Sequence, residues 1–172
     1  LVDRANYDLP FIMGHEFAGT IVKTGEDVQG FREGDRVAGE THIPCGYCET
    51  CRTGNQHICG NHMGVLGRTV DGCFADYIAL HEKALIKLPD NVSFEEGAIL
   101  EPFATAMHAV SKADPSGKSL LIAGTGTIGQ MAIEIAKFLG CTKLFAVDVN
   151  DYKLEEAKKR AADIIINGTK ED

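Results

Sequence analysis

The sequence has little of several features that would suggest a partner. Its 172 residues include no Trp, and 17 Lys and Arg stand against 25 Asp and Glu, which leaves a net charge of -8. No basic cluster of the kind that binds nucleic-acid phosphates is present. Apolar runs such as 120–123 and 164–166 are far shorter than the ~18 residues that a membrane-spanning helix needs. We therefore expect neither nucleic acid nor a membrane as partner.

Targeting segments and biased composition are also missing. No succession of basic, apolar and small residues marks a secretory signal or a transit peptide, so we expect a cytoplasmic protein. An apolar fraction of 44% with 24% charged residues excludes a disordered or collagen-like chain. Glycine, by contrast, is abundant, with 19 of 172 residues, or about 11%, compared with roughly 7% in an average protein. Such an excess indicates turns with a specific purpose.

Four of the six cysteines are clustered in a C-x2-C-x2-C-x7-C array formed by Cys45, Cys48, Cys51 and Cys59. Four thiolates complete the tetrahedron of a structural zinc site, and Gly46 and Gly54 ease the turns between them. An iron–sulfur cluster is one alternative, although the ferredoxin run has a shorter last spacing and a Pro after its last Cys. A disulfide or redox C-x2-C pair is another, although no strand opens into a helix at Cys45. We therefore predict structural zinc.

Residues 16 to about 90 have the pattern of short strands separated by turns. The predicted strands are Phe17–Lys23, Asp35–Glu40, Cys73–Leu80 and Leu85–Leu88. Strands at this spacing indicate an antiparallel barrel or sandwich, with the cysteine cluster as a lobe on one loop. The capping-box spacing of Ser93 and Glu96 then predicts a helix, and Pro102 is placed for the first turn of the next helix.

After residue 115 the pattern changes to strands that alternate with helices. The predicted elements are strand Ser119–Ala123, helix Thr127–Leu139, strand Lys143–Val149, helix Asp151–Ala161 and strand Asp163–Asn167. Such alternation predicts a parallel sheet. We therefore expect an α/β chain of two domains, a β-rich one over residues 1–115 and the first half of a Rossmann fold over residues 116–172.

A G-x-G-x-x-G turn, Gly124 to Gly129, joins the first of these strands to its helix, and Asp148 follows 19 residues later at the end of the second strand. This context predicts a dinucleotide site, in which the helix N-terminus binds a pyrophosphate and the acid accepts ribose hydroxyls. Since the carboxylate repels a 2′-phosphate, we expect NAD rather than NADP, a preference that Lys153 weakens slightly. The alternative is a Rossmann-like sheet without a nucleotide. The expected cofactor contacts are Gly124, Gly126, Ile128, Gly129, Asp148 and Lys153.

A barrel with a four-cysteine lobe, followed by a dinucleotide fold, resembles the zinc-dependent medium-chain alcohol dehydrogenases. The motifs that carry the resemblance are Gly14-His15-Glu16, Gly34-Asp35-Arg36-Val37, the cysteine array, the stretch from Asp71 to Tyr77, Lys87-Leu88-Pro89, Glu101-Pro102 and the Gly124 turn. They occur in the family's order along the chain. The resemblance implies a partial GroES-like antiparallel barrel followed by a partial Rossmann fold.

Two branches of this family compete. The run Gly39-Glu40-Thr41-His42-Ile43 looks like the L-threonine 3-dehydrogenases. Polyol dehydrogenases of the sorbitol type, or butanediol dehydrogenases, are the alternative. The Glu-Pro and following His of the sorbitol type are matched by Glu101-Pro102 and His108, whereas Ala104–Met107 stands where threonine dehydrogenases usually carry Gly-Asn-Ala-Val.

The resemblance also assigns residues to a catalytic zinc. It implies His15 and Glu16 as ligands, Glu101 as a further carboxylate at that metal or in its proton relay, and His42 in the substrate pocket. From the residues alone, neighbours on an extended strand point to opposite faces, so His15 and Glu16 reach one ion only if the chain bends, which Gly14 permits. The alternatives are an interior histidine at position 15, a surface charge at 16 and a solvated loop histidine at 42.

The activity that the resemblance implies is hydride transfer from a secondary alcohol to NAD, with zinc polarising a small-molecule substrate, in a homo-oligomer. A non-catalytic, zinc-stabilised nucleotide-binding protein is the alternative of another class. Family members carry a further zinc-ligating Cys upstream of Gly-His-Glu and a second half of the Rossmann fold. We therefore expect these 172 residues to belong to a longer enzyme and to be inactive alone.

Overall fold

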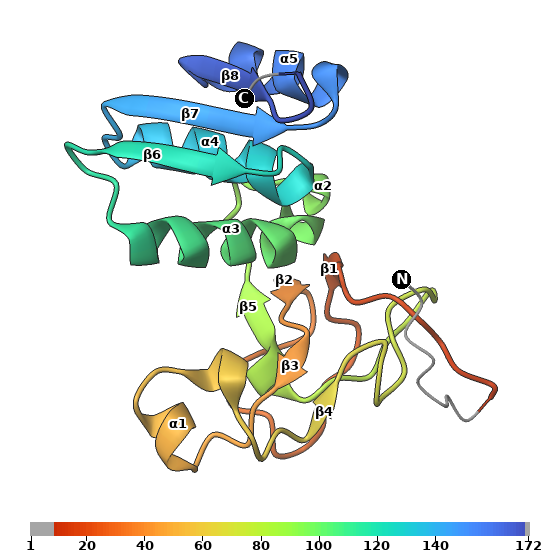
Figure 1. Cartoon of the computed structure of the whole chain (residues 1–172). Coiled ribbons are helices and arrows are strands. Elements are labelled where there is room, and N and C mark those ends of the chain that lie inside the picture. Colours follow the sequence, from red (N-terminus) through yellow and green to blue (C-terminus); the bar gives the residue numbers. More distant parts are fainter. Residues whose placement is uncertain (1–8, 171–172) are drawn as a thin grey trace. The chain divides into compact units, whose positions relative to one another are not determined.

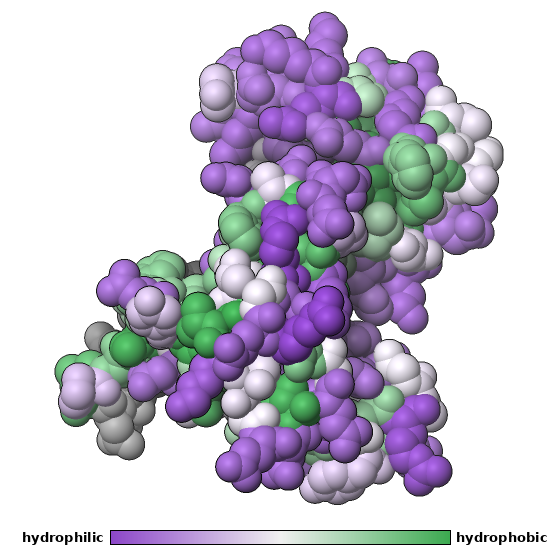
Figure 2. All heavy atoms as spheres, turned by 180° about the vertical axis from the view of Figure 1, so that it is seen from behind, coloured by the Kyte–Doolittle hydropathy of each residue, from purple (hydrophilic) through white to green (hydrophobic). Residues whose placement is uncertain are grey.

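The computed structural model describes residues 9–170. Their contacts divide the chain into two compact units, Leu1–Glu101 and Pro102–Asp172. None of the described helices is long and apolar enough to cross a lipid bilayer. The face shown in Figure 2 is largely hydrophilic, with smaller apolar patches between the polar side chains.

The first unit is built on an antiparallel sheet of three short strands in the order β1, β2, β5. These are β1 (Ala18–Thr20), β2 (Arg36–Gly39) and β5 (Leu85–Lys87). In the register Ala38 of the central strand faces Ala18 on one side and Ile86 on the other. A second pair, β3 (His42–Ile43) with β4 (Gly64–Val65), is also antiparallel. The predicted antiparallel, strand-rich fold of this part is thus confirmed (Figure 1).

Short helices complete this unit. They are α1 (Glu49–Arg52), the 3-10 turns η1 (Gln56–Ile58) and η2 (Glu82–Ala84), and α2 (Phe94–Ala98). The predicted capping box is present, because the Ser93 hydroxyl accepts from the Glu96 amide at 3.1 Å and the Glu96 carboxylate accepts from the Ser93 amide at 2.8 Å. These two bonds satisfy backbone donors that would otherwise be unpaired at the start of α2.

The predicted strand Cys73–Leu80 is wrong. The amides of Cys73 and Phe74 donate instead to the carbonyls of Gly14 and Met13, at 3.0 Å each, and the amide of Ala75 turns back to the carbonyl of Cys73. A segment whose amides are used in this way has no ladder to offer a neighbouring strand. Residues of this segment and of β1 line an open pocket of about 1050 Å³ in the first unit.

The second unit contains a parallel sheet in the order β6, β7, β8 (Figure 1). Its elements are α3 (Leu100–Ala113, which begins in the first unit), β6 (Ser119–Ala123), α4 (Thr127–Phe138), β7 (Lys143–Asp148), α5 (Asp151–Arg160) and β8 (Ile164–Asn167). The predicted alternation of strands and helices is confirmed, and element ends differ by one residue at most.

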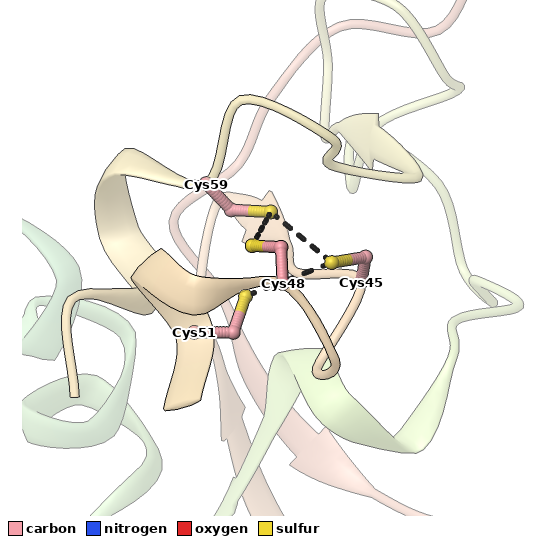
Figure 3. A group of neighbouring side chains, drawn as sticks. All are labelled: Cys45, Cys48, Cys51 and Cys59. Carbon is pink, nitrogen blue, oxygen red and sulfur yellow. Dashed lines mark hydrogen bonds between the residues drawn. The ribbon is translucent and has the colours of Figure 1, made fainter. Parts of the chain in front are cut away.

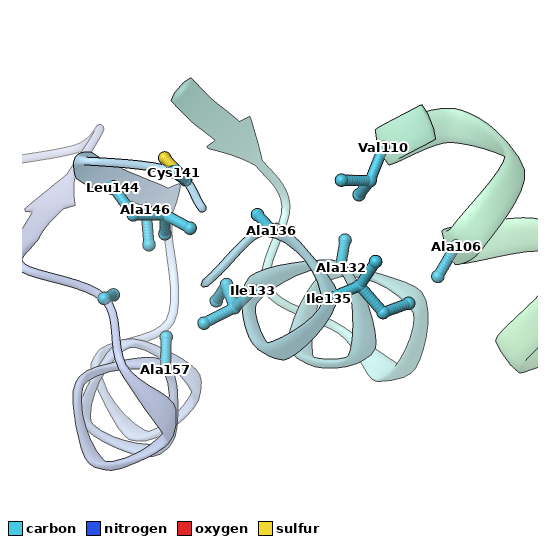
Figure 4. Packing of buried hydrophobic residues seen from close by; sticks show 11 residues of the cluster. Ala106, Val110, Ala132, Ile133, Ile135, Ala136, Cys141, Leu144, Ala146 and Ala157 are labelled. Carbon is cyan, nitrogen blue, oxygen red and sulfur yellow. The ribbon is translucent and has the colours of Figure 1, made fainter. Parts of the chain in front are cut away.

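One apolar cluster holds the second unit together (Figure 4). Helix α4 contributes Ile133 and Ala136, which are fully buried, and β7 contributes Leu144, which is also fully buried. Ala106 and Val110 of α3 lie in the same cluster. Because α3 buries its apolar face here, the structure divides the chain after Glu101, earlier than the boundary near residue 115 that the sequence suggested.

Candidate functional site

The four clustered cysteines lie around one point in the lobe between β3 and β4 (Figure 3). The Sγ atoms are 3.8 Å apart for Cys45 and Cys51, 3.7 Å for Cys48 and Cys59, and 3.6 Å for Cys59 and Cys45. A tetrahedron of thiolates about 2.3 Å from a central zinc has edges of about 3.8 Å, whereas a disulfide needs about 2.0 Å. The cluster is therefore able to bind zinc, and all six cysteines are free thiols.

Local structure explains how the lobe places these thiols. Cys48 is the N-cap of α1, Cys51 lies within that helix, and Cys59 follows η1. Burial raises the pKa of Cys45, but backbone hydrogen bonds from Tyr47 and Cys48, together with side-chain hydrogen bonds from Cys48 and Cys59, lower it overall. Burial raises the pKa of Cys51. Three of these thiols are buried and that of Cys48 is half-buried. A cation between them would stabilise four thiolates at such short distances, which fits the predicted structural zinc.

A lysine from outside the lobe reaches this cluster. Lys83 of η2 donates from Nζ to the carbonyl oxygen of Cys45 at 2.7 Å. Its side chain lies over Gly46, where an added Cβ would come within 2.8 Å of Nζ. Gly46 also has φ +82°, a conformation that side chains rarely adopt, so the lysine and the turn fit only with glycine there.

A second group of metal-ligating side chains contains His15, Glu16 and Glu101, with one ligand atom of each within 4.8 Å of the others. His15 and Glu16 precede β1 and are not part of a strand, and Gly14 before them has φ +94°. The expected bend is thus present, and it lets neighbouring side chains turn toward one point. The structure brings these three predicted residues together.

The bend is held in place by a loop much later in the chain. A Cβ on Gly72 would lie 2.2 Å from the carbonyl oxygen of Gly14, and one on Gly67 would lie 2.5 Å from the same atom. The amide of Ile12 donates to the Asp71 carboxylate at 3.1 Å. The backbone of the loop therefore packs directly on the segment that carries His15.

Of two neighbouring residues in the first unit, Thr41 contacts the metal-ligating group and His42 does not. Thr41, which is 7% exposed, donates its hydroxyl to the Glu101 carboxylate at 2.6 Å. His42 lies instead beside Glu40, with Nδ1 3.7 Å from Oε1, and near the ring of His62. Among the described residues, the metal-ligating group at Glu101 does not include His42. Thr41 was not assigned a role from the sequence. Its position beside His42 was the only signal that could have pointed to it.

The three glycines of the G-x-G-x-x-G turn have three different reasons to be glycine. Gly124 has φ +89°, the left-handed region that favours glycine. A Cβ on Gly129 would lie 2.0 Å from the Gly124 carbonyl oxygen, so helix and turn pack only without it. Gly126, the N-cap of α4 with φ -72°, has open space where a Cβ would be. Glycine is favoured over alanine at an N-cap, but the described structure leaves room for a side chain at 126.

Asp148, at the end of β7, faces this turn. One of its carboxylate oxygens accepts from the amide and the hydroxyl of Thr125 at 2.7 and 3.1 Å, and the other accepts from the amides of Val149 and Asn150 at 2.8 and 3.0 Å. The Thr125 and Asn150 backbone bonds are the main cause that lowers the pKa of Asp148 to about 2. The group is thus an ionised acceptor at neutral pH. Ile128 and Lys153, the other expected contacts, are both exposed.

A comparison with known protein families identifies the family of this chain. Residues 2–90 match the alcohol dehydrogenase GroES-like domain. The chain belongs to the alcohol dehydrogenase family. This finding confirms the resemblance to its zinc-dependent medium-chain members and the partial GroES-like fold. The L-threonine 3-dehydrogenase of Legionella pneumophila (strain Corby) is 44% identical over 164 residues, which are 95% of this chain and 48% of that relative.

Solved alcohol dehydrogenase structures share the fold. The galactitol-1-phosphate dehydrogenase of Escherichia coli matches with a TM-score of 0.91 and 35% identity, over 98% of this chain and 49% of that one. An alcohol dehydrogenase of E. coli CFT073 complexed with NADH matches with a TM-score of 0.88 and 32% identity, over 95% and 49% of the two chains. This chain thus spans about half the length of the relatives it matches.

Proposed function

We propose that this chain is part of a zinc-dependent, NAD-linked dehydrogenase that oxidises a small secondary alcohol, with L-threonine as the first candidate substrate. One observation carries the proposal: the chain holds two separate metal-ligating groups together with a glycine-rich turn that leaves open space at Gly126, where α4 begins. The similarity to an L-threonine 3-dehydrogenase supports the choice of substrate.

The residues would share the work as follows. His15, Glu16 and Glu101 supply one nitrogen and two carboxylates to a cation, and the Thr41 hydroxyl fixes the Glu101 carboxylate from the side. Zinc bound there would polarise the alcohol oxygen and favour loss of its proton. Glu101 is the group placed to hold or pass on that proton. The four-cysteine lobe, with no open position for a fifth ligand, would only stabilise the fold.

The second unit would hold the cofactor. The first amides of α4 point out of the turn at Gly126 and offer donors to a pyrophosphate, with the positive end of the helix dipole behind them. Asp148 supplies negative charge at the end of β7, where it favours ribose hydroxyls over a 2′-phosphate. NAD bound in this position would accept the hydride. The NADH in a structure with the same fold supports this assignment.

A polyol phosphate or a polyol is the second candidate substrate. The galactitol-1-phosphate dehydrogenase that matches this chain favours it, as does the Glu101-Pro102 pair followed by His108 about two turns later in α3. The NAD-dependent oxidation of L-threonine, sorbitol and galactitol 1-phosphate by the full-length protein should be measured in parallel. Turnover of threonine alone supports the first candidate, and turnover of a polyol without threonine refutes it.

Metal analysis tests whether the protein is an enzyme at all. Two zinc ions per chain are expected, one in the cysteine lobe and one at His15, Glu16 and Glu101. A single zinc that is lost on replacing Cys51 with Ser, together with no oxidation of any of the three alcohols, would favour the non-catalytic nucleotide-binding alternative. His15→Ala should remove one zinc ion and leave the lobe loaded.

Three wider assignments are part of the same proposal and rest on the family resemblance. The first unit, up to Glu101, would carry the substrate and metals, and the second unit would carry the cofactor. The protein would act as a homo-oligomer. It would do so in the cytoplasm.

A further inference from the structure

Thr125 occupies an unusual position in the cofactor turn. It is 1% exposed and one of only three buried polar or charged residues in the described part of the chain. Every polar atom of this residue has a partner within the second unit. Its amide and hydroxyl both donate to one oxygen of Asp148, and its carbonyl accepts from the Gln130 side chain at 3.0 Å.

Gln130 extends this connection to the next helix. Its Nε2 donates both to the Thr125 carbonyl and to the Lys153 carbonyl, at 3.0 and 2.9 Å. The two donors of the amide are therefore used, which fixes its orientation. Its Oε1 is the one buried side-chain oxygen or nitrogen without a partner among the described residues.

These contacts join the parts of the site that would bind different parts of NAD. The turn from Gly124 to Gly129 would bind the pyrophosphate, and Asp148 would bind the ribose. A buried hydroxyl between them leaves the carboxylate little freedom to rotate, because a second bond to the same oxygen comes from the Thr125 amide.

We propose that Thr125 is a positioning residue for cofactor selection, which holds the Asp148 carboxylate against the phosphate turn so that it excludes a 2′-phosphate, while Gln130 holds the turn itself. The inference rests on the proposed NAD site. Thr125 governs the preference for NAD over NADP, whereas Gln130 governs the affinity for both nucleotides alike.

The test compares three variants of the full-length protein with the unsubstituted protein, by titration calorimetry with NAD and with NADP. Thr125→Val keeps the shape and removes the hydroxyl. It should weaken NAD binding roughly three- to tenfold and reduce the ratio of the NADP and NAD dissociation constants by a similar factor. Thr125→Ser, the matched control, keeps the hydroxyl and should keep the ratio. Gln130→Leu should weaken both nucleotides by the same factor.

A second measurement needs no nucleotide. Carbon NMR titration of the Asp148 carboxyl should show its pKa near 2 in the unsubstituted protein and the Thr125→Ser variant, and a higher pKa in the Thr125→Val variant, since a donor to the ionised form is lost. A lower melting temperature in Thr125→Val with an unchanged ratio of dissociation constants and an unchanged titration would overturn the inference. If the titration shifts as expected but the unsubstituted protein binds neither nucleotide, the proposed function fails and this role with it.

Discussion

Substitution of Gly126 with Ala should separate cofactor binding from folding. The backbone at this position has φ -72°, which alanine adopts freely, and an added Cβ meets no atom within 4 Å. Glycine is the better N-cap by up to about 1 kcal/mol, but alanine loses less chain freedom on folding by ~0.4–1 kcal/mol, so these two effects nearly cancel. The free energy of unfolding should change by less than about 1 kcal/mol.

NAD binding should respond quite differently to the same methyl group. If the pyrophosphate lies against the Gly126 backbone, a Cβ pushes it away from the first amides of α4. A loss of tenfold or more in affinity, about 1.4 kcal/mol, is expected. Calorimetric titration with NAD, together with thermal unfolding of the same samples, measures both quantities.

Gly129→Ala provides the contrasting case. Its Cβ would lie 2.0 Å from the carbonyl oxygen of Gly124, a backbone atom that cannot rotate aside. Overpacking of this kind costs about 1–3 kcal/mol, which lowers the melting temperature by roughly 2–4 °C for each kcal/mol in a chain of this length. This variant should lose both stability and NAD binding.

Gly19→Ala is the control, since an added Cβ there also has open space but lies in β1 of the other unit. It should leave the affinity for NAD unchanged. If Gly126→Ala bound NAD as tightly as the unsubstituted protein, the assignment of this turn to a pyrophosphate would be refuted.

Three further predictions concern the first unit. Cys51→Ser should remove zinc from the lobe, as measured by metal analysis. Without its metal the lobe should become more sensitive to limited proteolysis. Lys83→Met should speed the release of zinc to a chelator several-fold, because the hydrogen bond from its charged amine to the Cys45 carbonyl is lost. Lys23→Met, at an exposed lysine of the same unit, is the control and should leave the release rate unchanged. Equal rates in both variants would exclude a role for Lys83. Thr41→Val should slow alcohol oxidation several-fold at constant zinc content, since the Glu101 carboxylate loses its hydroxyl partner, and an unchanged rate would contradict that role.

The second unit could be predicted from the sequence almost element by element, whereas in the first unit the sequence located β1, β2 and β5 but not their pairing, and placed a strand at 73–80 that is absent. In the second unit each strand pairs with the next one along the chain, and apolar periodicity within each segment is enough to assign it. In the first unit, β2 pairs with β5 about fifty residues later, and segment 73–80 uses its amides on residues 13 and 14. Such long-range pairing leaves no mark on the local pattern.

The candidate sites show the same division. All four ligands of the cysteine site lie within one short segment, so their spacing alone predicted the site. The glycines of the phosphate turn also form a local motif that is recognisable in the sequence. The buried threonines that fix Glu101 and Asp148 were missed, because Thr41 is 60 residues from the first and Thr125 is 23 residues from the second. A threonine in a sequence carries no indication of which distant carboxylate its hydroxyl will meet.

The loop that packs on Gly14 has a consequence for the order in which the protein acquires its metals. The cysteine lobe draws its ligands from residues 45–59 and can close around zinc as soon as this short segment is made. The group at His15 draws on residues 15, 16 and 101, and its bend needs Gly67 and Gly72 in place. The two sites should therefore load in sequence, with the lobe first, and occupation of the second site would report that the first unit has finished folding.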